Sequence, residues 1–358
     1  CSLGSLEMNY SFGDIYEGKK VLLTGHTGFK GSWLSIWLRE LGAEVLGVSL
    51  KPKNELDNFN VTRLESKINS VFLDIRKYSD IHDIFEEFRP EIVFHLAAQA
   101  LVSVSYNKPR LTFETNAIGT LNILEAIQNH DSVKAGVLIT SDKCYKNIEQ
   151  IWGYRENDVL GGDDPYSSSK ACAEIIINSY IKNENSKGVA LIASARAGNV
   201  IGGGDWSEDR LVPDCFRSLF VNESITLRNP LSTRPWQFVL EPLKGYLMLG
   251  EKLIKGSKKY VGSWNFGPSQ ENVYTVNDVV NHIITLWGDG QVNIQESQEF
   301  IESNLLQLDC TKSRTQLGWK PTLSFEDSFR YTTDWYKYLK EDTSRDMYQF
   351  CVSQISKY

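Results

Sequence analysis

The sequence predicts an α/β fold, a doubly wound parallel sheet followed by a smaller C-terminal α/β domain that holds the substrate. Two observations lead to this prediction. Short apolar segments alternate with segments of helical periodicity through the first half of the chain, a pattern typical of parallel sheets with helices on both faces. A loop with regularly spaced glycines also joins the first apolar segment to the first helical one, where such folds bind phosphate groups.

Composition narrows the class of protein. With 358 residues the chain is long enough for one large or two modest domains. A charged fraction of 23% and a hydrophobic fraction of 41% are ordinary for a globular protein. The net charge of -7 argues against binding to the phosphate backbone, so no nucleic-acid partner is expected.

The spacing of the cysteines and the lengths of the apolar runs indicate in which cellular compartment the protein is expected. The six cysteines form neither a Cys-x-x-Cys motif nor a Cys/His cluster, so no metal site and no disulfide framework are predicted. No apolar run approaches the length of a membrane span, and we expect a cytoplasmic protein without a membrane partner. Residues 1–18 are interpreted as an N-terminal lead, either cloning-derived or disordered. A lipid-anchored Cys1 is the alternative.

The first strand and its loop predict a dinucleotide site. Val21-Leu22-Leu23 runs into a Gly-x-x-Gly-x-x-Gly loop, which a helical segment follows. This context separates a cofactor loop from a glycine-rich turn without a ligand. The glycines allow a tight turn and a close approach of backbone N–H groups to a pyrophosphate, and the helix N-terminus adds positive charge. The sequence therefore predicts a Rossmann-type domain in which NAD or NADP is bound by Gly25, Thr27, Gly28, Phe29, Lys30 and Gly31.

The second predicted strand, Glu44–Leu50, leaves the choice of cofactor open. NAD enzymes usually place an acidic residue about 20 residues beyond the loop to bind the ribose. Here Lys51 stands at that position. A lysine would suit the 2′-phosphate of NADP. It could equally point to solvent, with Ser49 or Asn54 binding the ribose hydroxyls of NAD.

Two further strands contribute candidate cofactor residues. Val71–Asp74 ends in Asp74, followed by Ile75, and Asp74 either accepts a hydrogen bond from the adenine amino group or caps a helix over Tyr78–Phe88. In the strand Ile92–Ala98 the small residues would let the cofactor pass close to the backbone. The candidates here are Leu96, Ala97 and Ala98, whereas His95 is interpreted as a core histidine.

The strand Val137–Thr140 ends in a polar group, Ser141-Asp142-Lys143. Downstream, Tyr166 and Lys170 are four residues apart. If Asp163 or Asp164 caps a helix that begins near Pro165, both side chains lie on one helical face. A nearby ammonium group favours the phenolate, which would make Tyr166 a base near neutral pH. Chance spacing is the alternative, and the cofactor loop upstream makes it less attractive.

Together these residues resemble the extended short-chain dehydrogenase/reductases that act on nucleotide sugars. The resemblance runs from about Lys19 to about Tyr338. Ser141-Asp142-Lys143 resembles the 4,6-dehydratases, most of which carry Asp-Glu after the serine or threonine. Its Asp-Lys resembles the CDP-glucose 4,6-dehydratases. Segments that agree with this subgroup are Gly25–Trp33, Thr140–Tyr145, Trp152–Glu156, Arg196–Trp206 and Arg234–Gln237.

The resemblance implies the conversion of CDP-glucose to CDP-4-keto-6-deoxyglucose. C4 is oxidised, water is lost across C5 and C6, and the hydride returns to C6. Tyr166 would take the 4-hydroxyl proton, Lys170 would lower the pKa of Tyr166 and hold the cofactor ribose, and Ser141 would hydrogen-bond the same hydroxyl. Asp142 would be an acid whose pKa burial raises, and Lys143 a base whose pKa desolvation lowers.

The resemblance also implies substrate ligands and an assembly. Arg210 and Arg234 are expected to bind the pyrophosphate bidentately, although each could instead pair with a surface carboxylate. A homodimer would form through helices Leu111–Asn129 and Tyr166–Lys182. The expected substrate-binding residues are Gln99, Asn116, Asn199, Arg210 and Arg234.

The resemblance also divides the chain. Residues 19–200 are assigned mainly to the cofactor domain and residues 201–345 mainly to the nucleotide-sugar domain, with interleaved segments, before a tail over residues 346–358. Three other activities stay open at this point. They are a nucleotide-sugar 4-epimerase or reductase, a dehydratase for another nucleotide-linked hexose, and a non-catalytic NAD(P)-binding sensor.

Overall fold

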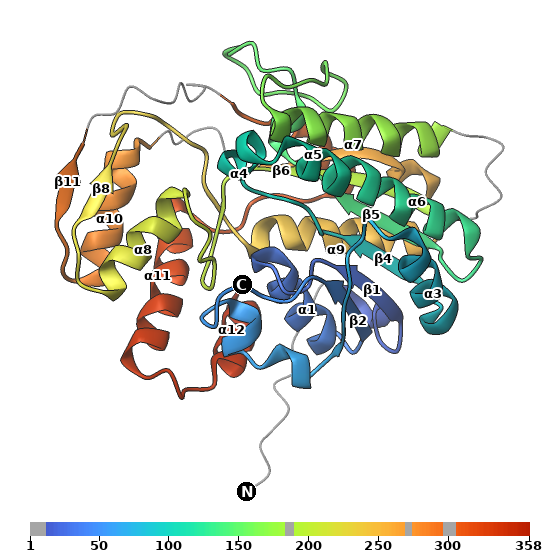
Figure 1. Cartoon of the computed structure of the whole chain (residues 1–358), viewed down its shortest axis with the longest axis horizontal. Coiled ribbons are helices and arrows are strands. Elements are labelled where there is room, and N and C mark those ends of the chain that lie inside the picture. Colours follow the sequence, from blue (N-terminus) through green and yellow to red (C-terminus); the bar gives the residue numbers. More distant parts are fainter. Residues whose placement is uncertain (1–11, 183–189, 269–273, 296–305) are drawn as a thin grey trace, which may run out of the picture.

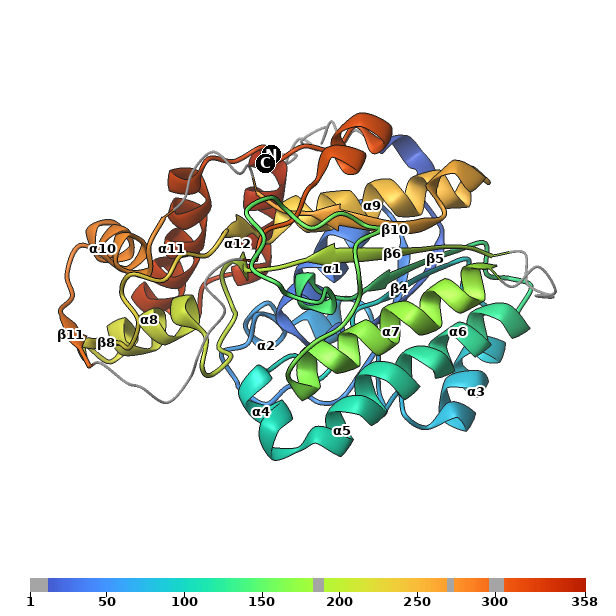
Figure 2. The same cartoon turned by 90° about the horizontal axis from the view of Figure 1, so that it is seen from above.

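The structure, a computed structural model, describes residues 12–182, 190–268, 274–295 and 306–358. Its centre is a parallel sheet of seven strands in the order β10-β6-β5-β4-β1-β2-β3, with helices on both faces (Figures 1 and 2). This is the doubly wound Rossmann arrangement that the sequence predicts. The strands are β1 (Lys20–Thr24), β2 (Glu44–Ser49), β3 (Asn69–Phe72), β4 (Ile92–His95), β5 (Ala135–Ile139), β6 (Leu191–Ala197) and β10 (Gly262–Phe266).

One face of the sheet is covered by α3, α6 and α7, and the other by α1 and α9 (Figure 2). The 11 residues of α3 are those predicted, because its apolar positions recur at helical spacing. The predicted helix Leu111–Asn129 is instead two helices joined by a π-helical turn, Glu114–Ile118. These helices are α1 (Phe29–Glu40), α3 (Tyr78–Phe88), α5 (Pro109–Phe113), α6 (Gly119–Asn129), α7 (Pro165–Lys182) and α9 (Leu240–Ile254).

A second lobe is built mainly from later segments of the chain (Figure 1). Two small parallel sheets, β8 with β11 and β7 with β9, belong to this half of the chain. The strand β10 nevertheless joins the main sheet, so the two halves are interleaved in sequence. Later elements are β7 (Val200–Ile201), β8 (Ile225–Leu227), β9 (Gln237–Phe238), β11 (Val292–Ile294), α8 (Leu211–Phe220), α10 (Val276–Trp287), α11 (Phe325–Glu341) and α12 (Met347–Lys357).

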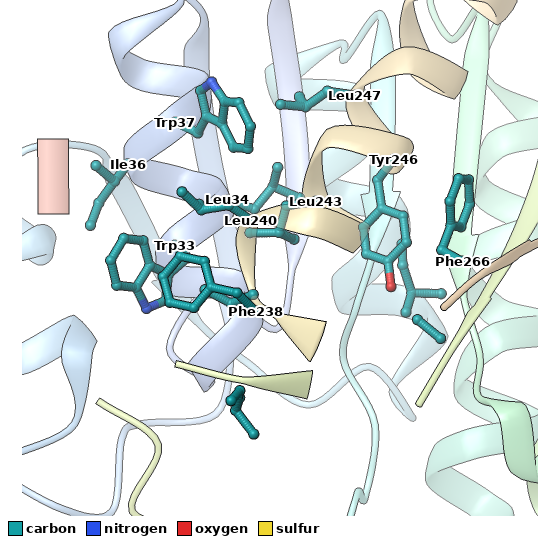
Figure 3. Close-up of a cluster of buried hydrophobic side chains, with 14 of the residues drawn as sticks. Trp33, Leu34, Ile36, Trp37, Phe238, Leu240, Leu243, Tyr246, Leu247 and Phe266 are labelled. Carbon is teal, nitrogen blue, oxygen red and sulfur yellow. The ribbon is translucent and has the colours of Figure 1, made fainter. Parts of the chain in front are cut away.

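The larger core lies between the sheet, α1 and α9. Figure 3 shows Trp33, Leu34 and Trp37 of α1 facing Leu243 and Leu247 of α9. All five side chains are buried, and burying large apolar side chains contributes about 1.5–3 kcal/mol each. Packing of α1 against this core fixes the helix whose N-terminus follows the glycine loop.

The glycine run Gly202–Gly204 is closely packed. A Cβ on Gly203 would lie 1.9 Å from the ring of Trp335, and the indole of Trp33 donates a hydrogen bond of 2.9 Å to the Gly203 carbonyl. These glycines let the first part of the second lobe pass against α1 and α11. None of the described helices has the length and apolar character to cross a membrane.

Several predicted boundaries differ from the structure. β3 and β4 end at Phe72 and His95, before the residues predicted to lie at their ends. In β4 the ladder stops because the Ala97 N–H donates to the Thr24 hydroxyl at 3.1 Å instead of to a strand carbonyl.

Both predicted terminal segments contain ordered structure. Phe12 and Tyr16, inside the predicted lead, are buried in the main core, and residues 346–358 include α12, which packs on α1 (Figure 1). Residues 1–11, with Cys1, lie outside the described part of the chain.

Candidate active site

The polar residues that follow β5 meet the first turns of α7. Ser141 and Asp142 are buried, and Asp142 begins a 3-10 turn that contacts α7. The Ser141 hydroxyl donates to Asp142 Oδ1 at 2.9 Å and accepts from the Lys143 N–H at 3.2 Å. The Ser141 side chain also acts on the Tyr166 phenol, where its effect is to lower the pKa. The structure therefore brings Ser141, Asp142 and Tyr166 together.

The start of α7 explains how Tyr166 and Lys170 come to face the same site. Asp164 Oδ1 accepts the Ser167 N–H at 2.9 Å, so Asp164 is the capping residue of the two that the sequence offers. Pro165 is the first helical residue. Tyr166 and Lys170 then lie one turn apart, and both are buried.

Burial governs the protonation of this pair. It lowers the pKa of the Lys170 ammonium to about 8, against smaller opposite effects of Cys144 and Glu174. It raises the pKa of Tyr166 above its ordinary value, although the Ser141 hydrogen bond and the Arg210 charge act to lower that pKa. The expected lowering of the Tyr166 pKa is therefore wrong for this structure, because desolvation outweighs the favourable charges.

A glycine makes room for the Asp142 carboxylate. A Cβ on Gly198, which follows β6, would lie 2.0 Å from Asp142 Oδ2. Any side chain at this position would push the carboxylate from its place beside Ser141. The end of β6 therefore shapes the same site as the end of β5.

The glycine loop has the close contacts that a pyrophosphate site needs. Gly25 has a φ of +79°, and a Cβ there would lie 2.7 Å from the Ala97 backbone nitrogen. A Cβ on Gly31 would lie 2.0 Å from the Gly25 carbonyl. Gly28 is the N-cap of α1, so the positive end of the helix faces the space above the loop.

The residues expected to bind the adenosine make contacts with one another or with neighbouring side chains. Arg76 forms an ion pair with Asp74 at 2.5 Å, and Lys77, not Asp74, is the N-cap of α3. The Thr27 hydroxyl hydrogen-bonds Ser49 at 2.8 Å. The exposed Lys51 ammonium lies 5.8 Å from the centre of the Phe72 ring.

His95 is the core histidine that the sequence predicts. Its ring nitrogens lie 2.7 Å from the Thr24 hydroxyl and 3.1 Å from the Thr120 hydroxyl. Burial lowers its pKa to about 3. It is therefore neutral and fully hydrogen-bonded near pH 7.

The residues after β4 are bound to one another and to α7. The Asn116 amide accepts from the Gln99 N–H at 2.8 Å and donates to the Gln99 carbonyl at 3.0 Å. It also donates to Ser169 at 2.9 Å. Asn116 thus has the partners that a buried amide requires, and it ties the loop that contains Ala97 and Ala98 to the catalytic helix. Ile75 contacts the start of α6 at Gly119.

The two predicted arginines differ in their surroundings. Arg210 pairs with the buried Asp205 at 3.2 Å, and its charge acts to lower the pKa of Tyr166, so it lies near the candidate site. Arg234 donates to the Thr233 carbonyl at 2.8 Å, just before β9. Asn199 has a φ of +49° and its carbonyl accepts from Gln237 at 3.2 Å.

Comparison with known proteins shows the family of this chain. The GDP-mannose 4,6 dehydratase family matches residues 22–332. This chain belongs to the GDP-mannose 4,6 dehydratase family. A CDP-glucose 4,6-dehydratase from Salmonella typhimurium is 46% identical over 331 residues, which cover 90% of this chain and 92% of that protein. The prediction of a nucleotide-sugar dehydratase family is confirmed.

Solved structures support the fold. A UDP-glucose 4-epimerase from Thermotoga maritima with UDP-glucose has a TM-score of 0.76 at 24% identity, covering 89% of this chain and 98% of that one. A dTDP-glucose 4,6-dehydratase from Bacillus anthracis in complex with NAD has a TM-score of 0.75 at 22% identity, covering 90% and 98%. The Rossmann-type fold predicted from the sequence is confirmed.

The sequence analysis predicts Lys30 as a cofactor residue, but two features of this member of the GDP-mannose 4,6 dehydratase family escaped it: the low pKa of Lys30 and a buried ion pair. Lys30 is half-buried in the first turn of α1, and desolvation lowers its pKa to about 7. The charges of Lys170 and Arg210 also lower this pKa, whereas the charge of Asp142 raises it. A lysine at a helix N-terminus opposes the helix dipole, and this conflict was a usable signal. The second feature is a buried ion pair, Glu174–Arg196, beneath the site. Nothing in the local sequence marks it.

Proposed function

We propose that this protein is a CDP-glucose 4,6-dehydratase that converts CDP-glucose to CDP-4-keto-6-deoxyglucose with NAD as its cofactor. The observation that carries the proposal is the buried Ser141-Asp142 pair at the end of β5, followed by Lys143 in a turn that packs against α7, the helix of Tyr166. A 4-epimerase needs the serine and the tyrosine, but has no use for an additional acid and base at this place. The 46% identity to a CDP-glucose 4,6-dehydratase supports the same activity.

The residues of the glycine loop fit a dinucleotide. Gly25 and Gly31 leave no room for a Cβ and keep the loop folded tightly at the N-terminus of α1. Gly28, Phe29 and Lys30 would face the pyrophosphate, with Thr27, Asp74, Ile75 and the Leu96–Ala98 segment along the rest of the cofactor. When bound, the nicotinamide accepts a hydride from C4 of the sugar and later returns it to C6. Lys51 stands where NAD enzymes usually carry an acidic residue, and NADP is the alternative that the test below distinguishes.

The first step is removal of the 4-hydroxyl proton. Tyr166 takes that proton as phenolate while the C4 hydride leaves, which oxidises C4 to a ketone. The Ser141 hydroxyl donates to the same oxygen, and its existing contact with Tyr166 holds both groups on one side of the sugar. Lys170, one turn further along α7, would hold the cofactor ribose, and its charge would act against the burial that raises the pKa of Tyr166.

The second step is the loss of water. The new ketone acidifies the proton on C5, and Lys143 takes that proton. Asp142 gives a proton to the departing 6-hydroxyl, so one water leaves and a C5–C6 double bond forms. Lys143 would return its proton to C5 as C6 is reduced, so that Lys143 is again ready to act as a base.

The substrate would lie between the main sheet and the second lobe. Arg210 reaches the catalytic group from the second lobe and is half-exposed, so it can bind a pyrophosphate oxygen. Arg234 would contribute on the other side, with the Asn199 backbone between them. Gln99 and Asn116 would shape the sugar pocket through their mutual hydrogen bonds.

The enzyme would act as a homodimer in the cytoplasm. The helices expected at the interface carry exposed apolar side chains, with Ile118 beside α6 and Ile175 on α7 exposed by 47% and 57%. Exposed isoleucines on adjacent helices favour burial against a second copy. The five cysteines in the described part of the chain are free thiols, as in a reducing compartment.

The test is to incubate purified protein with CDP-glucose, without added cofactor, and to measure the alkali-induced absorbance of a 4-keto-6-deoxy sugar. dTDP-glucose and GDP-mannose are run in parallel. We expect signal with CDP-glucose alone, because the cofactor is regenerated and copurifies. A signal that requires added NADP would assign that cofactor instead. Silence with all three sugars, with and without cofactor, would disprove the dehydratase.

Two variants separate the dehydratase from an epimerase. Asp142→Asn and Lys143→Met are expected to lower the rate of dehydration by about 10²–10⁴-fold, the usual contribution of a general acid or base. C4 oxidation should still proceed, so reduced cofactor should accumulate and be detected by its absorbance at a longer wavelength than that of the oxidised cofactor. Lys146→Met, an exposed lysine just beyond the site, is the control and keeps full activity. Full activity in Asp142→Asn would favour the epimerase.

A further inference from the structure

Three side chains away from the active site have the donor set of a metal site. His82 and Glu86 are one turn apart on α3, and His130 follows the last residue of α6. Their candidate ligand atoms all lie within 4.8 Å of one another. Both views place α3 and α6 side by side, at the end of the molecule away from the second lobe (Figures 1 and 2).

The hydrogen bond of His130 fixes which ring nitrogen is free. Its Nδ1 lies 2.6 Å from the Ala126 carbonyl oxygen. A carbonyl only accepts, so Nδ1 carries the proton and donates it. In a neutral imidazole the lone pair is then on Nε2. Ligand histidines in metal sites commonly make this second hydrogen bond, which orients the ring.

That lone pair points at another acceptor. His130 Nε2 lies 3.3 Å from Glu86 Oε1, is buried and has no hydrogen-bond partner, and its side chain is only 5% exposed. Two acceptors at this distance repel each other unless positive charge lies between them. Ligand atoms of a tetrahedral site with bonds of about 2.0–2.1 Å are roughly 3.3 Å apart, which matches the observed separation.

His82 completes the set. Its Nδ1 is also buried without a hydrogen-bond partner, and its ring centre lies 4.9 Å from that of His130. Two imidazoles and one carboxylate are a donor set that zinc prefers. The Glu86 side chain is 59% exposed, so an ion has a route from solvent.

We propose that His82, Glu86 and His130 bind one zinc ion, with water as a fourth ligand on the exposed side of Glu86. The ion would tie the C-terminal end of α6 to α3, on the face of the sheet that also carries α7. The sequence predicts no metal site because the ligands come from two helices and form no local cluster. Only the packing of α3 on α6 brings them together.

One other species would satisfy the same atoms. A proton on Nε2 would turn His130 into an imidazolium that pairs with Glu86, and no metal would be needed. Zinc titration distinguishes a zinc site from an ion pair between protonated His130 and Glu86, because the ion pair alone would bind no zinc.

The experiment is calorimetric titration of zinc into the full-length protein after dialysis against a chelator, with thermal unfolding as a second measurement. The variants are Glu86→Gln and His82→Gln, whose side chains are less buried than that of His130. Glu87→Gln is the matched control, an exposed neighbour on the same helix. Folding of each variant is checked by its unfolding temperature without metal.

We expect wild type and Glu87→Gln to bind one zinc ion per chain and to unfold at a higher temperature with zinc. Glu86→Gln and His82→Gln should bind at least about tenfold more weakly, because each loses a direct ligand. Absence of binding by wild type, or equal affinity in all four proteins, would overturn the proposal. The titration uses no sugar substrate, so its outcome does not depend on the proposed activity.

Discussion

The ammonium group of Lys170 is buried beside Tyr166, and this burial sets its pKa and the free energy cost of its charge. The sequence shows that the two side chains share one helical face, and the structure confirms this. The sequence does not show how strongly each group is shielded from water. Spacing along a helix carries no information on desolvation, so the direction of the Tyr166 pKa could not be predicted. For the same reason the low pKa of Lys30 could not be predicted, because it comes from burial and from charges on other elements.

We predict that Lys170→Met stabilises the fold at pH 7. Burial lowers the folded-state pKa of Lys170 from 10.5 to about 8. Below pH 8 the ammonium is charged in both states, and the folded state bears the full cost of burying it. As the pH rises from 8 to 10.5, the folded state loses its proton first and this cost disappears. At 1.36 kcal/mol per pH unit, the cost is on the order of 3 kcal/mol.

Urea unfolding at pH 7 and at pH 10 measures this effect. Lys170→Met should unfold at a higher urea concentration than wild type at pH 7, with a smaller difference at pH 10, while catalysis is lost. Lys182→Met, an exposed lysine in the last turn of the same helix, should show no gain. Equal stability of Lys170→Met and wild type at pH 7 would contradict the prediction.

Between elements, one buried network joins the catalytic helix to three strands. Glu174 of α7 pairs with Arg196 of β6 at 2.6 Å, and both side chains are at most 1% exposed. Thr140, which follows β5, donates to Glu174 at 2.5 Å, and Ser263 of β10 donates at 3.2 Å. The network therefore fixes the end of β5, where Ser141 begins, against α7.

Most of the individual elements could be predicted from the sequence, but not this network. The apolar runs of β1, β2 and β5 and the helical spacing of α3 and α11 place them within a few residues of the structure. Glu174 looks like an ordinary surface residue of a helix. Its burial depends on partners from β6, β10 and the end of β5, whose approach only the tertiary packing determines.

We predict that Glu174→Gln destabilises the protein by about 3–5 kcal/mol, because it leaves the Arg196 charge buried without its partner. The double variant Glu174→Met, Arg196→Met should regain most of the loss, since two apolar side chains need no charge partner. Urea unfolding of both proteins measures the difference. A double variant that is less stable than Glu174→Gln would show that the hydrogen bonds of the network, and not the unpaired charge, determine the effect.

At the scale of the whole molecule, the C-terminal segment packs back against the first domain. α12 lies against α1 (Figure 1), where the Tyr348 hydroxyl donates to Glu40 at 2.5 Å and Cys351 contacts Asn58 at 3.4 Å. Beyond the helix, the Tyr358 hydroxyl donates to Glu241 of α9 at 2.7 Å. The sequence could not predict this closure, because the short amphipathic segment shows its role only against α1. Strands of two or three residues, such as β7 and β8, were missed for the same lack of local signal.

Removal of residues 346–358 should therefore weaken the cofactor domain as well as the second lobe. The deletion takes away five buried side chains of α12 and exposes one side of α1, whose N-terminus carries the glycine loop. At about 1.5–3 kcal/mol for each large apolar side chain, we expect a loss on the order of 5 kcal/mol and a lower unfolding temperature in differential scanning calorimetry. Lys357→Ala, an exposed residue of the last turn, is the control and should unfold like wild type. A truncated protein that unfolds at the wild-type temperature would mean that α12 only covers a core already complete without it.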